Sequence, residues 1–585
     1  MTEPTPASSG ISRPSRPRTR RSGRAAERHS FVASRVGAYD ATALATAMSD
    51  RLAAEAAAAG VPMELFPSGD ERRWVPIGPS VTRAFSWFFT PSFPRATGRV
   101  RDLAVSGDGR RAYAATAKGG VWYTDDGGAT WSPVGGWAAR SAVAGGVHNA
   151  QSCGALLVAF ADPPGPDPKA DAARDFVLVG TGELQGFGRP PARPALAGRG
   201  VLAALGPATK PGNDPTWEPE AGSSVFEGLG IFELARDPAA TPGRATGPVV
   251  DRVAAGTSAG LFLGIRRPAA APHNGEFTWV AKPALGTFMG LPAGRQPIVT
   301  EVLWIARGGS PDGRILVAVA LGLETPARAG VAPPGSGVAY TDDLGATFHW
   351  VAGLDPTAPG ATPIVGRMSF ANPEADRVYV LGDRQPAAPT ATVATVWRIE
   401  TAAAATPSAE LIAGVPVVWV ANSLGKNQRD YDQAIAVDVV DGVDRVYLGG
   451  NTGPTGASLW CLDVSVGPAL VPTTGVSRTG SPPSGDGAAS GGYIGGSVHP
   501  DIHMIRLAGT HPNRQVWVAT DGGVFVSTQA GRANTFAPPG DGHGRIGGQL
   551  HRRPPDIESF RRHRYAGQRS AVPGRRPGVA RHHGW

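Results

Sequence analysis

The chain has 585 residues, including 80 Gly and 55 Pro, so it is long enough for a large core interrupted by many turns. Its net charge of +8 lies at the two ends, where residues 1–36 carry +6 and residues 537–585 carry +7, which leaves −5 on the 500 residues between them. A mildly acidic centre excludes the core as a nucleic-acid surface, since phosphate backbones require a basic face. Two cysteines are too few for a disulfide framework, and no apolar run approaches the ~20 residues that span a bilayer.

The N-terminal part is predicted to lie outside the main fold. Residues 1–36, rich in Arg, Pro and Ser, are expected to form a disordered basic arm. Residues 37–75 are expected to form a helical leader and linker, with Asp40 as helix N-cap and Gly60 ending the helix. Because no apolar segment of a signal peptide follows the early arginines, the sequence predicts a cytoplasmic protein, or an exported one if the start is misassigned.

Residues 76–536 are dominated by a repeat. A polar turn followed by a short apolar strand recurs seven times, at intervals of 62 to 76 residues. The copies are Arg111–Thr116, Asp175–Gly180, Asp251–Gly256, Gly313–Val319, Asp376–Gly382, Asp444–Gly449 and Asn513–Ala519. Each follows another apolar strand, and several precede a third strand that opens with Gly. This pattern predicts an all-β, multi-bladed β-propeller with about seven blades, rather than an antiparallel solenoid.

A longer motif, [S/T]-x-D-x-G-x-T-[W/F], occurs in two full copies. They are Thr124, Asp126, Gly128, Thr130 and Trp131, and then Thr341, Asp343, Gly345, Thr347 and Phe348. A worn third copy between Ser527 and Phe536 has Gln529 in place of the Asp. The Asp can accept hydrogen bonds from its own turn, and the Gly can adopt positive φ. We expect these residues to be structural, with both aromatic side chains buried.

The motif resembles the Asp-box, or BNR repeat, of the β-propellers found in sialidases, xyloglucanases and sortilin-type receptors. The resemblance covers most of residues 98–536 and implies that these turns lie on outer hairpins, away from a central ligand site. The chain lacks the Phe-Arg-Ile-Pro segment, Arg triad and Tyr/Glu nucleophile of sialidases, and the paired Asp segments of xyloglucanases. We therefore expect a monomeric binding propeller for a glycan or peptide; a glycoside hydrolase is the alternative.

Candidate ligand-binding residues follow from the propeller architecture, in which the first strand of each blade lines the central channel. Polar residues near the starts of these strands include Arg101, Glu301, Asp432, Gln433 and His503. A ring of mixed charge at a channel mouth suits a polar ligand such as a sugar. The alternative is that strand starts are simply exposed to water.

A metal site is a second hypothesis. His499, Asp501 and His503 alternate along the chain, so an extended strand would place them on one face, and Asp521 after the next strand could add a ligand. Imidazole and carboxylate groups suit Zn²⁺ or a similar divalent metal, the only cofactor that the sequence suggests. The alternative is a hydrogen-bonded network that braces the blade.

Catalytic candidates are few. Glu183 and Asp383 are expected directly after strands, and either could pair with Asp501 as the acid and base of a glycosidase.

Residues 537–585 do not fit the repeat. They are crowded with Arg, His, Gly and Pro, as expected for a disordered tail or for a GC-rich gene read out of frame. A shift of one nucleotide restores an apolar strand and a Gly-rich turn, so we favour the out-of-frame interpretation. It predicts no regular structure beyond about residue 540 and a gap in the ring.

Overall fold

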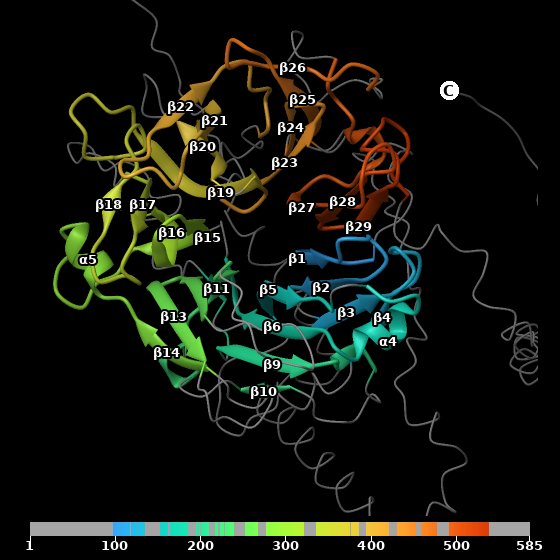
Figure 1. The fold of residues 1–585 in the computed structure, drawn as a ribbon, viewed down its shortest axis with the longest axis horizontal. Helices are drawn as coiled ribbons and strands as arrows, with labels where there is room; N and C mark the ends of the chain where they lie inside the picture. The colour runs from blue at the N-terminus through green and yellow to red at the C-terminus, as the bar shows by residue number, and fades with distance from the viewer. Residues whose placement is uncertain are drawn as a thin grey trace, which may run out of the picture.

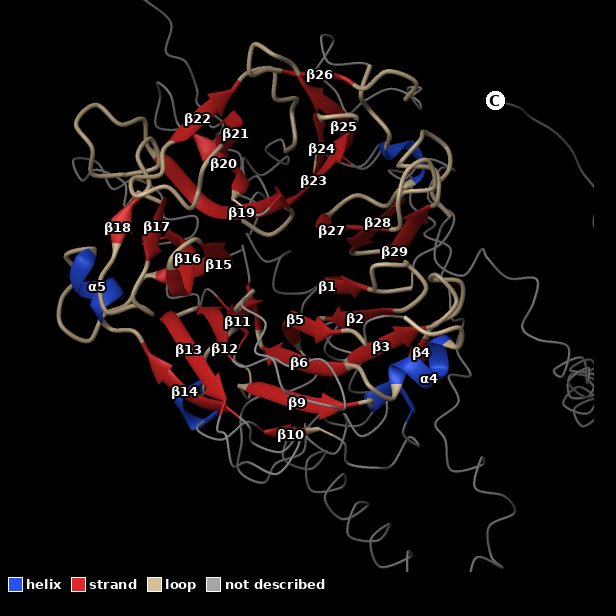
Figure 2. Cartoon of the chain, in the orientation of Figure 1, coloured by secondary structure: helices blue, strands red, loops and turns tan. Residues whose placement is uncertain are grey.

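The computed structural model describes residues 97–537 except 118, 135–151, 162–163, 185–194, 197, 199, 210–216, 220–222, 227, 239–251, 267–276, 321–334, 375, 385–392, 420–429, 452–457 and 477–490. The predicted basic arm, the helical leader and almost all of the tail lie outside the described residues. Seven antiparallel sheets follow one another along the chain and stand around a common axis (Figures 1 and 2). The chain is a seven-bladed β-propeller.

Each blade begins at the axis and runs outward in chain order. Blade 1 comprises β1 (Val100–Val105), β2 (Ala112–Thr116), β3 (Val121–Thr124) and β4 (Ser132–Pro133). Blade 2 comprises β5 (Cys153–Ala159), β6 (Phe176–Thr181), β9 (Val201–Leu205) and β10 (Glu218–Pro219). Blade 3 comprises β11 (Ile231–Arg236), β12 (Arg252–Thr257), β13 (Gly260–Arg266) and β14 (Phe277–Ala281). Blade 4 comprises β15 (Ile298–Arg307), β16 (Ser310–Ala320), β17 (Gly337–Thr341) and β18 (His349–Trp350).

The remaining blades follow the same plan. Blade 5 comprises β19 (Ile364–Glu374), β20 (Arg377–Arg384), β21 (Val393–Ile399) and β22 (Ala409–Ile412). Blade 6 comprises β23 (Ala434–Val440), β24 (Val443–Gly450), β25 (Ser458–Val464) and β26 (Leu470–Pro472), and blade 7 comprises β27 (Ile502–Ala508), β28 (Gln515–Thr520) and β29 (Gly523–Ser527). The other elements are a small sheet, β7 (Glu183–Leu184) with β8 (Ala195–Leu196), and the short helices α4 (Pro168–Ala172), α5 (Ala284–Phe288), η2 (Pro207–Thr209), η3 (Ser223–Phe226) and η4 (Gly495–Ser497).

The seven sequence repeats are the second strands of the seven blades, as predicted. A second strand is paired on both edges within its sheet, and both faces are covered by the neighbouring blades. Its central residue is therefore fully buried in every blade: Tyr113, Leu178, Ala254, Leu316, Tyr379, Tyr447 and Trp517 are all 0% exposed. Burial on both faces requires a continuous apolar run, which is why the repeat is visible in the sequence.

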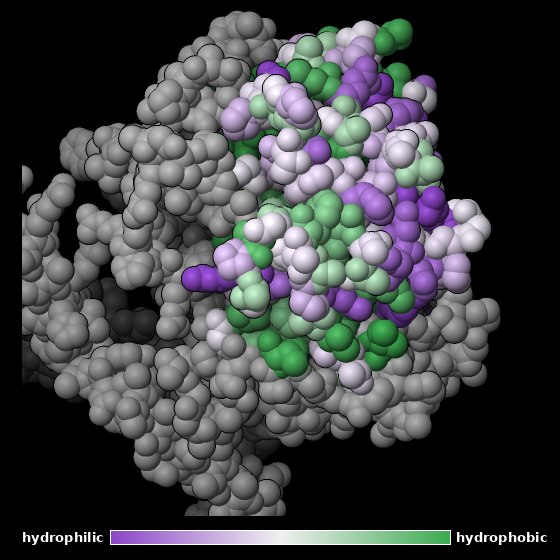
Figure 3. Space-filling view, turned by 90° about the vertical axis from the view of Figure 1, so that its left-hand side faces the viewer, coloured by the Kyte–Doolittle hydropathy of each residue, from purple (hydrophilic) through white to green (hydrophobic). Residues whose placement is uncertain are grey.

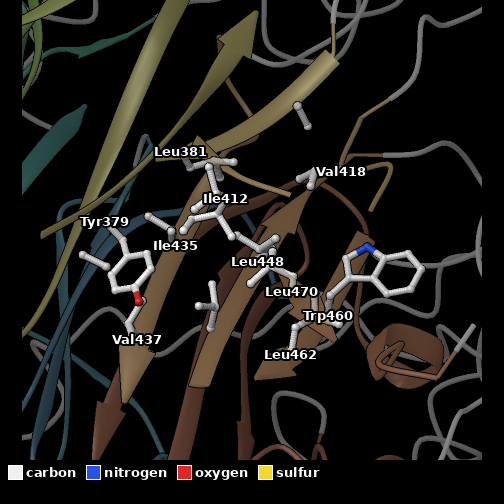
Figure 4. Close-up of a cluster of buried hydrophobic side chains, with 14 of the residues drawn as sticks. Tyr379, Leu381, Ile412, Val418, Ile435, Val437, Leu448, Trp460, Leu462 and Leu470 are labelled. Atoms are coloured by element: carbon white, nitrogen blue, oxygen red, sulfur yellow. The ribbon is translucent and has the colours of Figure 1, made fainter. Parts of the chain in front are cut away.

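Blade faces pack on one another through apolar side chains. Between blades 5 and 6, Tyr379 and Leu381 of β20 face Ile435 and Val437 of β23 (Figure 4). The same kind of packing closes the ring, because Val100 and Leu103 of blade 1 cluster with Met504 of blade 7. The predicted gap in the ring is therefore not found. The outer edge of blade 7 continues in a bridge between Val526 and Ala537, the last described residue.

Buried polar clasps also join adjacent blades. Arg111 forms an ion pair with Asp175 of blade 2, and Tyr113 donates a hydrogen bond to the same carboxylate (3.2 Å). The arrangement recurs between blades 5 and 6, where Arg377 and Tyr379 both bind Asp444. Each clasp joins an Arg and a Tyr two residues apart to the Asp that begins the next repeat, so the polar turn in the sequence repeat has a structural role.

The two motif turns are the hairpin corners between third and fourth strands. In the first, Asp126 accepts hydrogen bonds from Thr124 Oγ1 (2.8 Å), Thr130 N (2.8 Å) and Thr130 Oγ1 (2.6 Å). Asp343 receives the same bonds in the second turn. In the worn turn, where the Asp is absent, Ser527 and Thr535 bond directly (2.6 Å). Phe348 is buried as expected, but Trp131 is only half-buried, with its ring edge-on to Trp517 of blade 7.

Replacing Asp126 by Ala is expected to lower the free energy of unfolding by about 1 kcal/mol, at the low end of the usual range because water reaches this turn. Although partial burial opposes its charge, the hydrogen bonds from Thr130 hold the pKa of Asp126 below its usual value. Urea unfolding of Asp126→Ala beside Asp125→Ala would measure the effect, since the Asp125 side chain takes no part in these bonds. Equal stabilities of the two variants would contradict the structural role.

The surface of the ring is mixed in character. On the side carrying α5 and β18, hydrophilic and hydrophobic residues are interspersed where they are visible (Figure 3). Large apolar side chains that are exposed among the described residues are Val225, Ile265, Val280, Val393, Leu411, Val443, Val466 and Val471. No helix within the described part of the chain is long and apolar enough to cross a membrane.

Candidate functional site

The innermost strands share an irregularity that aims side chains toward the axis. Five of them carry a β-bulge at the same place, near the start of the strand. The extra residues are Arg101, Gly154, Phe232, Thr300 and His503. A bulge turns a side chain away from the regular alternation. Arg101 and His503, from neighbouring blades 1 and 7, come together in this way, with Nη1 and Nδ1 3.4 Å apart.

Tyr431, just before β23, lies at the centre of this group. Its carbonyl oxygen accepts hydrogen bonds from Arg101 Nη1 and from Arg367 Nη1 of blade 5, both at 3.2 Å. Its ring is covered by the guanidinium groups of Arg99 (5.2 Å) and Arg101 (5.6 Å) and meets His503 edge-on. One residue of blade 6 thus contacts blades 1, 5 and 7, which places it at the end of the central channel where innermost strands begin.

Four carboxylates at this mouth have fixed partners. Glu183 is ion-paired with Arg99, and Asp521 accepts from His503 Nε2 (2.7 Å). Asn451 donates to both Asp432 (3.2 Å) and Asp501. The first and second strands of a blade are antiparallel neighbours. The start of each innermost strand and the end of each second strand therefore lie at the same mouth of the channel. We call the following residues the mouth cluster: Arg99, Arg101, Glu183, Tyr431, Asp432, Asn451, Asp501, His503 and Asp521.

Exposure within the mouth cluster differs from the sequence prediction. Arg101, Asp432 and His503 are buried, whereas the side chains of Arg99 and Asp521 are 28% and 35% exposed. Gln433 is buried beside the cluster, accepting from Ser369 Oγ (3.0 Å) and donating to a backbone carbonyl. The polar residues at the strand starts are therefore buried and not simply exposed to water. The partly exposed groups, Arg99 and Asp521, lie outside the strands, next to their ends.

Burial governs the charge states of the His503 pair. Burial lowers the pKa of His503 to about 4, despite the opposing hydrogen bond to Asp521. Burial alone would raise the pKa of Asp521, but the bond to His503 and the nearby Arg99 hold it below the usual value. At neutral pH the mouth therefore presents a neutral imidazole bonded to an ionised carboxylate.

The predicted metal site is not formed. His499 bonds through Nδ1 to the carbonyl oxygen of Pro500 (2.6 Å), while His503 faces Asp521. Asp501 has a φ of 68°, and β27 begins only at Ile502, so the alternation assumed for residues 499–503 does not exist. No three His, Cys, Asp or Glu side chains of the described chain gather in a way that could hold a metal.

The three catalytic candidates differ in position and in partners. Glu183, on the short strand β7, is buried against Arg99, and Asp501 is held by Asn451. Asp383 does not follow a strand but lies within β20, opposite Val365 and fully buried.

A second group of charges comes from the innermost strands themselves. It comprises Asp102 of blade 1, Glu233 of blade 3, Glu301 of blade 4, Arg367 of blade 5 and Arg506 of blade 7, which we call the channel cluster. Arg506 bonds to Asp102 (3.3 Å), and Arg367 lies 3.9 Å from Glu301. Burial raises the pKa of Glu301 to about 7, although Arg367 and Arg506 oppose the shift.

Sequence reasoning missed Arg99, Tyr431, Asn451, Glu233 and Arg367. A usable signal existed for Glu233, because Asp102, Glu233 and Glu301 occupy the same position, directly after the bulge, in blades 1, 3 and 4. Alignment of the innermost strands would have shown it. Tyr431 and Asn451 lie in connections, where no repeat pattern marks them.

Comparison with known proteins adds the following. No family model matches the chain, and no curated protein does. Similar solved structures include a GH74 xyloglucanase from Xanthomonas campestris (16% identity, TM-score 0.41, 74% of this chain and 52% of that one) and the Dos1 propeller (11%, 0.36, 75% and 83%). Another is YCF48 bound to D1 peptide (10%, 0.33, 74% and 93%). The chain thus spans about half the length of the xyloglucanase, and similarity this distant says nothing of what it binds.

Proposed function

We propose that this propeller is a binding protein of the Asp-box type, which holds a peptide segment at the channel mouth. The observation that carries the proposal is that the carboxylates of the mouth cluster already have fixed partners: Glu183 has Arg99, Asp521 has His503, and Asn451 holds the other two. A glycosidase needs two carboxyl groups that exchange protons across the scissile bond. A binding site benefits instead from groups held in place before the ligand arrives.

A peptide suits the mouth better than a glycan. Sugar rings commonly stack on exposed aromatic faces, yet Tyr431 is buried under two guanidinium groups. None of the exposed large side chains in the described regions is aromatic. The mouth-cluster residues that are not fully buried are a cation, Arg99, two anions, Asp501 and Asp521, and the amide of Asn451. Such groups match the charged side chains and backbone amides of a peptide.

The proposal predicts that immobilised peptide arrays capture the purified protein and that Asp521→Asn weakens capture about tenfold or more, because a charge-assisted contact is lost. Glu410→Gln, an exposed carboxylate on the outer strand β22, is the matched control and should leave capture unchanged. If a glycan array captures the protein and the peptide arrays do not, the ligand is a carbohydrate and not a peptide.

Hydrolysis would be a different result. We expect no turnover of a fluorogenic sialoside or of xyloglucan oligosaccharides. Turnover that Asp521→Asn or an Asp501 variant abolishes would show instead that the hydrolase alternative is correct and that the mouth carboxylates are catalytic.

A further inference from the structure

Within the part of the chain that the structure describes, blade 7 has three strands, whereas the other six blades have four (Figure 1). Its last strand, β29, therefore forms the outer edge of the sheet. Among the described residues, backbone pairing on this edge is limited to the bridge between Val526 and Ala537 (3.3 and 2.9 Å). Because backbone groups point alternately to the two edges of a strand, Val524 presents its N–H and C=O on the same edge. Such an edge is a template for pairing with another segment.

Blades 1 and 4, which carry the two full motif turns, show what covers this edge elsewhere. Three residues after the aromatic residue of the motif, Val134 and Val351 each donate a backbone hydrogen bond to the third strand of their blade (2.9 Å each). Both valine side chains are buried. In blade 7 the third residue after Phe536 is Pro539, which has no N–H to donate. The chain after the worn turn therefore cannot pair with Val524 in the same way.

An apolar surface between blades 7 and 1 is left partly uncovered beside this edge. In blade 4, the motif residue Phe348 is buried against Phe288 of α5, the helix that follows the outer strand of blade 3. The equivalent Trp131 of blade 1 packs on blade 7, yet it stays partly exposed, and so does Trp122 in the same apolar cluster. The missing outer strand in the described part of blade 7 accounts for this difference. A free strand edge next to an apolar surface suits an extended segment with an apolar side chain.

A segment that precedes the ring has the sequence of such a strand. Residues 74–78 are Trp-Val-Pro-Ile-Gly, and residues 131–135, which include β4, are Trp-Ser-Pro-Val-Gly. The Pro is tolerated at an outer edge, where its missing N–H would point away from the neighbouring strand. Ile77 corresponds to Val134, so it offers the backbone N–H that Pro539 lacks and a β-branched side chain to cover the apolar surface.

The chain also enters the ring at the end of β29 that this strand would reach. Thr97 donates a backbone hydrogen bond to the carbonyl oxygen of Gly522 (2.9 Å), directly before β29. A fourth strand runs antiparallel to the third, so it would end beside Gly522. The chain between residues 77 and 97 can span up to about 60 Å, which is ample for a return to this point.

We propose that the outer edge of β29 binds residues 74–78 of the same chain as the fourth strand of blade 7. Val75 would pair with Val526 and replace the bridge described above. Ile77 would donate its N–H to the carbonyl oxygen of Val524 and place its side chain between blades 7 and 1. The segment would then join the two ends of the ring by backbone hydrogen bonds, in addition to the apolar packing there. This interaction surface lies on the outer rim and does not depend on the proposed peptide-binding function at the channel mouth.

A disulfide in the full chain tests the pairing directly. Val75→Cys together with Val526→Cys places two cysteines on a hydrogen-bonded cross-strand pair, whose Cα atoms lie about 5.5 Å apart, within the range of a disulfide. The native Cys153 and Cys461 are buried and do not compete. Mild oxidation should give about tenfold more cross-link than in the control, Val32→Cys with Val526→Cys, because a docked strand holds its cysteine in place and a flexible arm does not. Peptide mass spectrometry measures the product.

A peptide added to the protein tests the same surface without new cysteines. Ile77→Asp puts a charge on the apolar surface and should lower the melting temperature by several degrees, whereas Ile11→Asp, the matched control in the N-terminal arm, should not. A synthetic peptide of residues 72–80 should restore the melting temperature of Ile77→Asp by binding the vacated edge. The same peptide should leave the intact protein unchanged, because its edge is already occupied.

Three results would overturn the proposal. Equal cross-linking in the test and control pairs, or equal melting temperatures of Ile77→Asp and Ile11→Asp, would mean that residues 74–78 do not dock on β29. A cross-linked dimer on a non-reducing gel would mean that a second copy of the chain supplies the strand. A peptide that raises the melting temperature of the intact protein as much as that of Ile77→Asp would mean that the edge is open to a strand from a partner protein.

Discussion

Replacing Asp175 by Ala is expected to lower the free energy of unfolding by about 3–5 kcal/mol, the usual cost of breaking a buried ion pair on one side. Asp175 is fully buried and binds Arg111, Tyr113 Oη and the backbone N–H of Ala161 (2.9 Å). Without it, Arg111, which is 1% exposed, would keep a buried charge with no carboxylate. The clasp between blades 1 and 2 would then be lost.

Urea unfolding followed by tryptophan fluorescence would measure the change. Asp312→Ala is the control, because its ion pair with Arg252 is partly exposed and should contribute at most about 1 kcal/mol. The double variant Arg111→Met, Asp175→Leu should recover much of the loss, since two apolar groups leave no buried charge behind. A loss for Asp175→Ala no larger than that of the control would mean that the clasp does not stabilise the ring.

Acidification from pH 6.5 toward pH 4 is expected to destabilise the protein by up to ~3 kcal/mol through His503 alone. Burial keeps His503 neutral in the folded chain, with a pKa of about 4, whereas an unfolded histidine takes up its proton near pH 6.5. Between pH 6.5 and pH 4 the unfolded state therefore binds more protons than the folded state, so the free energy of unfolding decreases as the pH is lowered. Above pH 6.5 both states are neutral, and the contribution is constant.

Chemical denaturation of the intact protein and of His503→Gln at several pH values would test this expectation. The glutamine retains a hydrogen-bond donor for Asp521 but does not titrate, so the variant should show a flatter dependence between pH 4.5 and 6.5. His499→Gln is the matched control, because His499 is partly exposed at the same mouth. Identical slopes for the intact protein and His503→Gln would contradict a buried, neutral His503.

Much of the candidate site could not be predicted from the sequence, because local residue patterns do not show where a β-bulge occurs or which distant blades a connecting loop contacts. The expectation that His499, Asp501 and His503 share a strand face assumed regular alternation, which the left-handed Asp501 interrupts. Arg101 and His503 were expected as ligand contacts at strand starts, whereas the structure buries them as a pair. Tyr431 gave no signal, since its role depends on contacts with three other blades.

The sequence by itself determined the seven-bladed architecture. Second strands covered on both faces must be apolar throughout, and the turns that precede them must be polar, so the repeat appears directly in the residue order. Tertiary structure alone decided that the ring closes between blades 1 and 7, and that Tyr431 contacts blades 1, 5 and 7. The physical reason is distance along the chain: these groups lie far apart in sequence and come together only when the blades close around one axis.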